Sequence, residues 1–386
     1  MLKLTANWHG SITEIKENDW NNLSIGSTLP FYKWEWLEKL ESSGSVAKST
    51  GWQPFHLSVS REGKVIGIAP LYIKGHSFGE FIFDNRFHEL SQQIGLNYYP
   101  KLIGMSPYSP IEGYKFLISS QENEREITFI MLEIIDKFAI QNNILSCNFL
   151  YAENEWSKIV QEYGYQKWLN CQSLWLARST KDFSDYLQSF NSNQRRNIKR
   201  ERKSISESGI KIKSMSGEDI NSNLMLKMHE FYSNHCLKWG PWGSKYLTKS
   251  FFEKIASEKH KIVLFGAYRE DPNNPIAMSM CITDEKMLWG RYWGSQENIE
   301  YLHFELCYYT PIAWALKKGL RSFDPGAGGS HKLRRGFQAK SNQSLHRWYN
   351  KTMHDLIRSW LPKANQFMEE EINRINNELP FRTTSS

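Results

Sequence analysis

Residues Phe323–Phe337, with the sequence FDPGAGGSHKLRRGF, join a glycine cluster to a basic segment. The glycines let the backbone approach a ligand closely. A helix that begins near Ser330 would direct free N–H groups and a positive dipole at an anion or a developing oxyanion. Further donors follow at once: His331, Lys332, Arg334 and Arg335. The pattern indicates phosphate binding or acyl transfer, with a merely structural turn as the alternative.

Two phosphate-binding motifs are absent from this stretch. It contains neither G-x-x-x-x-G-K-[ST] nor the dinucleotide pattern G-x-G-x-x-G. Acyl transfer to an amine needs an anchor for the donor, a base for the amine proton and donors for the tetrahedral oxyanion. Ionisable residues close to this stretch in the sequence could supply the base and the donors.

His303 and Glu305 stand at the start of a predicted helix, directly after the strand Gly290–Gly294. A histidine suits general-base work, and a carboxylate suits base work or binding of the substrate amine. Side chains two residues apart do not share a helix face, but at a helix start both can reach one cleft rim. The alternative is a pair of ordinary polar residues near a cap. Arg291, on the preceding strand, could bind phosphate or carboxylate, or form a structural ion pair.

The composition is that of a globular protein with more than one domain. The 386 residues are 40% hydrophobic and 23% charged, with 15 Trp, 18 Tyr and 21 Phe. No apolar run is long enough to cross a membrane and the N-terminus has no apolar signal core, so we expect a cytoplasmic protein without a membrane span. The five cysteines lack CxxC spacing, which argues against a disulfide framework and against a metal site.

Alternating strands and helices predict an α/β (α+β) fold that is duplicated. Residues 56–73 and 261–282 each read as an antiparallel hairpin. Helices are predicted at 127–139 and at 304–318, where Pro311 should kink or break the second one. Gly164–Trp175 aligns with Gly336–His346 after one gap, through matching Gly-aromatic-Gln and Gln-Ser-Leu steps. This repeat points to duplication of a whole domain.

The expected domains follow from the repeat. Residues 1–176 form the first, with an extended loop at about 76–120 that is rich in Gly, Pro and aromatic residues and is a candidate wall or lid of the substrate site. Residues 177–350 form the second. An amphipathic helix at 351–378 should pack on the second domain, and residues 379–386 should be a disordered tail.

The Phe323–Phe337 segment resembles the signature of the FemAB-like predicted N-acyltransferases, described as peptidoglycan biosynthesis or recognition proteins. That signature reads close to F-E-P-G-A-Q-G-E-H-K-x-x-R-G-F, and Asp324 replaces its usual Glu. Other segments resemble the same family across most of the chain: Gly51–Pro54, Ala69–Lys74, Gly79–Asp84, Tyr98–Leu102, Asn193–Arg202, Gly290–Gly294 and Leu302–Glu305. The resemblance implies two tandem GNAT-like domains, each a mixed, mostly antiparallel sheet flanked by helices.

The resemblance also assigns roles to residues. Lys332 is expected to stabilise charge, because Fem-type enzymes place a lysine before a Gly-aromatic pair here, and it joins His303 and Glu305 as the candidate catalytic set. The substrate-binding candidates are Arg291, Tyr292, Trp293, His331 and Arg335 in the second half, and Glu80, Asp84, Tyr98, Tyr99 and Lys101 in the first. As a cleft residue, Lys332 is expected to matter for turnover and little for stability.

The donor is an acyl-CoA or an aminoacyl-tRNA, with no tightly bound cofactor. The CoA loop [RQ]-x-x-G-x-[GA] of single GNAT domains is missing from Tyr292–Glu300, as it is from the Fem-type aminoacyl transferases, which use charged tRNA. Arg195, Arg196, Lys199 and Arg200 lie in a segment where six basic residues face one acid. This run indicates a tRNA, coenzyme-phosphate or acidic membrane partner, or only a solvated helix face.

These observations predict an N-acyltransferase that moves an acyl or aminoacyl group to the amine of a small molecule or a peptidoglycan-related precursor. One cleft, at or near the junction of the domains and built mostly by the second, would hold the reaction. The alternative is a non-enzymatic recognition module for a cell-wall precursor or nucleic acid. A sequence-specific DNA binder is disfavoured, because no helix-turn-helix or zinc pattern is present.

Overall fold

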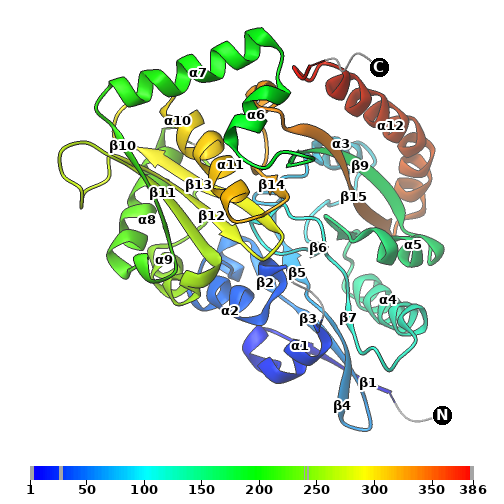
Figure 1. The fold of residues 1–386 in the computed structure, drawn as a ribbon. Coiled ribbons are helices and arrows are strands. Elements are labelled where there is room, and N and C mark those ends of the chain that lie inside the picture. The colour runs from blue at the N-terminus through cyan, green and yellow to red at the C-terminus, as the bar shows by residue number, and fades with distance from the viewer. Residues whose placement is uncertain (1–3, 26–28, 239, 241–242, 383–386) are drawn as a thin grey trace. The chain divides into compact units, whose positions relative to one another are not determined.

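The structure is a computed structural model that describes residues 4–25, 29–238, 240 and 243–382 (Figure 1). Two compact units are present. Within the described ranges, the first comprises Met1–Asn170 and Ser341–Glu370, and the second comprises Cys171–Lys340 and Glu371–Ser386. Both units combine helices with mostly antiparallel strands, and each unit contains one parallel pair of strands. The predicted α/β (α+β) fold class is confirmed.

The first unit contains two sheets. The smaller has the order β1 (Leu4–His9), β3 (His56–Arg61), β4 (Lys64–Ala69) and β7 (Leu117–Ile118), all antiparallel. The pair β3–β4 is the first predicted hairpin. The larger sheet has the order β15 (Gln338–Trp348), β8 (Ser146–Phe149), β6 (Lys101–Gly104), β5 (Tyr72–Lys74) and β2 (Trp52–Pro54). Within it β6 and β8 are parallel, with Ile103 opposite Asn148.

The helices of the first unit are α1 (Glu17–Leu23), α2 (Trp34–Ser42), α3 (Asn85–Gln93), α4 (Glu124–Gln141) and α5 (Asn154–Glu162), with short 3-10 turns at Ile12–Glu14, Pro30–Tyr32 and Lys48–Thr50. The predicted helix at 127–139 is the central part of α4. Asn123 caps α4 by accepting a hydrogen bond from the Glu126 amide at 3.0 Å, and acidic residues occupy its first turn. The α4 face that includes Ile127, Met131 and Ile135 is buried.

In the second unit the sheet order is β10 (Lys211–Ser216), β11 (Ile262–Tyr268), β12 (Ala277–Thr283), β13 (Met287–Ser295), β14 (Ser322–Asp324) and β9 (Gln166–Leu176). The pair β11–β12 is the second predicted hairpin. Strands β13 and β14 are parallel, with Leu288 opposite Phe323. Since β14 has only three residues, β13 runs on beyond the end of this pairing, next to the loop after Asp324.

The helices of this unit are α6 (Phe183–Ser189), α7 (Ser192–Glu207), α8 (Ser222–Leu237), α9 (Lys249–Ile255), α10 (Leu302–Phe304) and α11 (Thr310–Lys317), with 3-10 turns at Gly217–Asp219, Ala256–Lys261 and Ser330–Arg335 (η8). A π-helical segment, η7 (Glu305–Tyr309), joins α10 to α11. The helix does not break at Pro311, which lies in the first turn of α11 and has no N–H to donate; the irregularity that the sequence predicted is this π-helical segment directly before it.

The two matching segments become two eleven-residue strands, β9 and β15. The C-terminal end of each strand pairs with a strand from the other half of the sequence. The end of β9 pairs with β14 in the second unit, through Trp175 opposite Phe323. The end of β15 pairs with β8 in the first, through Leu345 opposite Phe149. The expected contiguous domains 1–176 and 177–350 therefore differ from the two compact units, whose boundaries fall inside these strands, at 170/171 in β9 and at 340/341 in β15.

Three further expectations are corrected. The segment 76–120 contains α3, β6 and β7 and is not an extended loop, because its apolar residues Phe87, Leu102 and Ile103 are buried. The C-terminal helix is α12 (Lys351–Asn377), but its buried residues Met353, Ile357 and Leu361 belong to the core of the first unit, not the second.

Residues 379–382 of the expected disordered tail are placed in the second unit. The Phe381 ring lies 5.3 Å from the Phe190 ring, and the two backbones form an antiparallel bridge. This apolar contact explains why the segment is held. Residues 383–386 lie outside the described residues.

Candidate functional site

The glycine loop after β14 is held by a buried lysine. Gly326, Gly328 and Gly329 all have positive φ, at 85°, 68° and 88°. A Cβ on Gly329 would lie 2.7 Å from the His331 ring. Lys332 Nζ donates to the carbonyl oxygens of Gly326 at 2.6 Å and Ala327 at 3.1 Å. The predicted helix at Ser330 is the six-residue 3-10 turn η8, which is too short to supply the expected helix dipole.

Asp324 and Arg291, which carry opposite charges, both act on Lys332. Asp324 accepts hydrogen bonds from the Gly326 amide at 2.7 Å and from Gln172 Nε2 at 2.7 Å, and it lies 3.5 Å from Arg291. The Arg291 and Asp324 side chains are buried. Burial lowers the pKa of Lys332 to about 8, although the Asp324 carboxylate acts to raise it. This lysine can therefore lose its proton at moderately alkaline pH.

Two histidines face each other beside this loop. The ring centres of His303 and His331 are 5.6 Å apart, and the Tyr308 hydroxyl is 2.8 Å from His331 Nε2. Trp293 packs on His303 at 5.0 Å. Burial, reinforced by nearby positive charge, lowers the pKa of His303 to about 3 and that of His331 to about 4. Both imidazoles are neutral at pH 7 and have a nitrogen lone pair that can accept a proton.

Glu305 does not share the contacts of His303. Its carboxylate forms a bidentate pair with Arg202 of α7 at 3.0–3.2 Å and accepts a hydrogen bond from Thr310 Oγ1 at 2.8 Å. Two residues along a helix correspond to a turn of about 200°, so the two side chains point in different directions. The structure groups His303, His331 and Lys332 and leaves Glu305 facing α7.

The other predicted substrate residues of this unit divide between the site and the core. Trp293 contacts His303, whereas the Tyr292 ring packs between Tyr232 at 5.3 Å and Phe252 at 5.8 Å. Consecutive strand residues face opposite sides of a sheet, which explains the division. Arg335 is buried, forms an ion pair with Glu201 at 2.8 Å and lies over the Phe304 ring at 3.4 Å.

The predicted phosphate-binding residues all lie on α7. Lys199, Arg200 and Arg196 are exposed, and Arg195 is half-buried. Arg196 donates to the Asn193 side chain at 2.6 Å. The opposite face of the helix is buried through Ile198, Glu201 and Ile205. The only acid in the run, Glu201, is therefore directed inward to Arg335, which leaves a basic outer face on α7.

All five predicted residues of the first unit form one cluster. Lys101 Nζ lies 2.8 Å from Glu80 and also pairs with Asp84, while it donates to Ser77 Oγ at 2.7 Å. The hydroxyl of Tyr98 donates to Asp84 at 2.6 Å, and that of Tyr99 lies 2.8 Å from Ser77. The ionic side chains are almost fully buried. Segments 79–84 and 98–101, separated by α3, thus meet at one place.

Burial and mutual attraction set the protonation of this cluster. Burial raises the pKa of Glu80 to about 7, against the opposing effect of Lys101. Burial alone would lower the pKa of Lys101, but Glu80 and Asp84 outweigh it and raise that pKa. Lys74 also belongs here: its Nζ lies 3.7 Å over the Trp52 ring and donates to the Phe78 carbonyl at 3.1 Å, and burial lowers its pKa to about 7.

None of the described helices combines the length and apolarity needed to cross a membrane. No group of three or more His, Cys, Asp or Glu side chains in the described ranges is arranged to hold a metal ion.

The profile of the FemAB-like family, described as peptidoglycan biosynthesis/recognition, matches residues 11–383. The chain belongs to the FemAB-like family. No curated protein matches its sequence. Among solved structures, FemX is similar at 13% identity, over 92% of this chain and 100% of that one, with a TM-score of 0.49. The C-terminal domain of a putative lysylphosphatidylglycerol synthetase from Agrobacterium fabrum reaches a TM-score of 0.52 at 8% identity, over 90% and 96%, which shows a shared fold.

In this FemAB-like protein, sequence reasoning found most of the polar residues that the structure groups together. It missed Tyr308, Lys74, Ser77 and Arg202. Lys74 closes the family-like segment Ala69–Lys74, so the signal was present. The partnership of Arg202 with Glu305 had no local signal, because 103 positions separate the two residues.

Proposed function

We propose that this FemAB-like chain is an N-acyltransferase that moves an acyl or aminoacyl group from an activated ester or thioester to an amine. The observation that supports this most is the group formed by His303, His331 and Lys332 in the second unit. It brings neutral imidazoles and an ammonium to a glycine loop at the end of the short strand β14. These are the chemical functions that amide formation needs.

In the proposed step, the amine nitrogen of the acceptor attacks the carbonyl carbon of the donor and a tetrahedral oxyanion forms. His303 or His331 takes the proton that the amine loses, as a weak base whose pKa burial has lowered. Lys332 uses two of its three N–H donors on loop carbonyls and offers the third to the oxyanion. The bond to the donor oxygen or sulfur then breaks, and the leaving group receives the proton. Glu305 would act indirectly, as a positioning residue for η7 through Arg202.

An aminoacyl-tRNA donor is favoured over an acyl-CoA. The CoA phosphate loop is missing from 292–300, and α7 presents a basic outer face. For the acceptor we propose the amine of a peptidoglycan precursor, in keeping with the description of the family.

The test is formation of a new amide. The purified chain would be incubated with a nucleotide-linked peptidoglycan precursor and either labelled aminoacyl-tRNA or acyl-CoA, with analysis by mass spectrometry. We expect an amide product with the wild type and loss of it with His331→Ala. Lys158→Ala, a change at an exposed pair on α5, is the matched control. Binding of the precursor without any amide from either donor would refute the transferase and favour the recognition module.

A further inference from the structure

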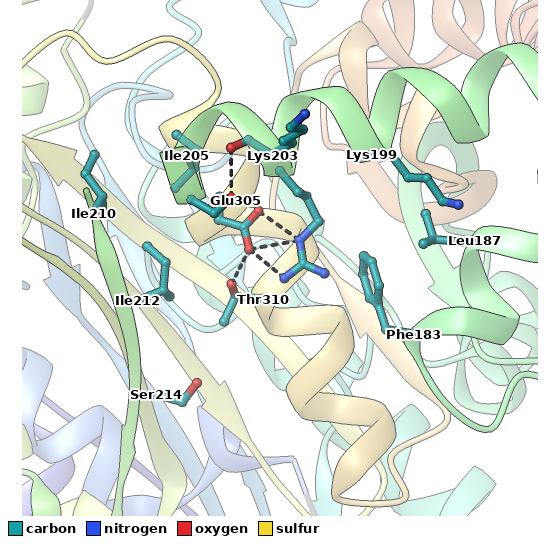
Figure 2. A pocket seen from close by; sticks show the side chains of 12 residues that line it. Phe183, Leu187, Lys199, Lys203, Ile205, Ile210, Ile212, Ser214, Glu305 and Thr310 are labelled. Atoms are coloured by element: carbon teal, nitrogen blue, oxygen red, sulfur yellow. Dashed lines mark hydrogen bonds and ion pairs between the residues drawn. The ribbon is translucent and has the colours of Figure 1, made fainter. Parts of the chain in front are cut away.

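A groove in the second unit lies along the side of α7, where Glu305 meets Arg202. It is lined by residues of α6, α7, β10, η7 and α11 and has a volume of about 650 Å³ (Figure 2). Five lining residues form an apolar floor: Phe183, Leu187, Ile205, Ile210 and Ile212. Its volume is in the range of small-molecule sites, roughly 300–1,000 Å³.

The rim of the groove carries positive charge. Lys199, Arg202 and Lys203 of α7 line it, and Glu305 is its one acidic residue. Arg202 neutralises Glu305 and covers the Phe183 ring at 4.3 Å. Lys203 forms an exposed ion pair with Glu207 at 3.4 Å, which contributes little to stability. Because Arg202 neutralises Glu305, the two lysines give the lining of the groove a net positive charge.

Arg202 retains donors for a ligand. Its bonds to Glu305 use Nε and Nη2, and its side chain is 36% exposed. A guanidinium has five N–H donors, so those on Nη1 are able to reach an anion in the groove. Arg202, Lys199 and Lys203 together can hold a charged head while the floor buries a chain.

We infer that this groove binds a single apolar chain that ends in an anionic head, a phosphate or a carboxylate. The rim cations match the head, and the five apolar side chains match the chain. A single-stranded RNA fits less well, since bases stack on aromatic rings and Phe183, the one aromatic of the lining, is covered by Arg202. This inference does not rest on the proposed transferase activity.

The experiment is calorimetric titration of the full chain, below the concentration at which the probes form micelles. Octyl phosphate and octanoate test the two heads, inorganic phosphate tests the head alone, and octyl glucoside tests the chain alone. We expect one molecule of octyl phosphate or octanoate to bind per chain. Inorganic phosphate and octyl glucoside should each bind at least about tenfold more weakly, because each lacks one half of the recognition.

Variants locate the binding. Lys199→Ala/Lys203→Ala should weaken octyl phosphate binding about tenfold, the combined effect of two partly exposed ion pairs. Arg196→Ala/Arg200→Ala is the matched control, since these cations lie on the same helix but do not line the groove, and it should change binding less than about twofold. Ile212→Glu, which puts an anion into the floor, should also weaken binding, and a thermal melt checks that each variant is folded.

Three results would overturn the inference. They are equal loss of binding in the two double variants, binding of inorganic phosphate as tight as that of octyl phosphate, and displacement of octyl phosphate only by tRNA. None of these results depends on whether an amide is formed, so failure of the groove and failure of the transferase remain distinguishable.

Discussion

Replacing Lys332 tests its role in catalysis and its effect on stability separately, because the two effects are expected to depend differently on pH. Replacement by methionine removes the charge and both bonds to the loop but keeps an unbranched chain of similar length. Its hydrogen bonds to the Gly326 and Ala327 carbonyls stabilise the fold by about 1.5 kcal/mol each, the lower end for charged donors, because water reaches these carbonyls. Burial of the ammonium opposes this by about 3 kcal/mol, corresponding to the fall of the pKa from 10.5 to about 8.

The two effects offset each other at pH 7, so we expect Lys332→Met to change stability there by about 1 kcal/mol or less. Replacing Lys332 is thus expected to change stability little because its hydrogen bonds and the cost of burying its charge offset each other, and not because the side chain is exposed. Above pH 8 the folded protein releases the proton while the unfolded chain still binds it. Stability of the wild type relative to the variant should therefore rise between pH 8 and 10.5, by up to about 3 kcal/mol.

Melting of both proteins at pH 7.5 and pH 10 measures this difference. Between these two pH values the expected change is about 2.5 kcal/mol, which corresponds to about 5–10 °C for a unit of this size. In the amide-forming assay, Lys332→Met should lower turnover about 100-fold, the scale of one lost oxyanion donor. Wild-type turnover should decline above pH 8, whereas Lys332→Arg, which stays protonated, should not show this decline. A melting difference that is the same at both pH values would refute the buried ammonium, and normal turnover of the methionine variant would remove Lys332 from the mechanism.

Three further outcomes follow from the structure. In a thermal melt, Lys101→Met should destabilise the first unit by about 3–5 kcal/mol, because Glu80 and Asp84 would remain buried without their partner. Lys158→Met, which removes an exposed ion pair, should have almost no effect in the same measurement. The imidazole NMR signals of His303 and His331 should not titrate between pH 5.5 and 8. Because the unfolded chain binds these protons first, the fold should lose stability as the pH falls from 6.5 toward 4 for His331 and toward 3 for His303; a midpoint near 6.5 for either ring would contradict their burial. Replacement of Arg195, Arg196, Lys199 and Arg200 by alanine should weaken tRNA binding and flatten its salt dependence, and an unchanged salt slope would show that the basic face only contacts solvent.

Local features of the sequence predicted the elements and many site residues. The apolar segments on both sides of polar turns predicted the hairpins β3–β4 and β11–β12, which are confirmed. The glycines and basic residues of 323–337 predicted a tight loop, because few other residues adopt positive φ. The resemblance to the FemAB-like family marked Glu80, Asp84 and Lys101 as substrate-binding candidates, and the structure joins them through ion pairs.

Only the tertiary structure decided which distant groups meet. The repeat predicted two similar strands, but no local pattern encodes their pairing with β14 and β8 from the other half of the sequence. The spacing of His303 and Glu305 was compatible with one cleft, and the helical turn between them together with Arg202 directs the carboxylate elsewhere. Burial of Lys74, Lys101 and Lys332 shifts their pKa values, and burial is a property of the packed chain. The sequence determined the local conformations and the kinds of chemical group, whereas long-range packing determined which groups are neighbours and how strongly they hold their protons.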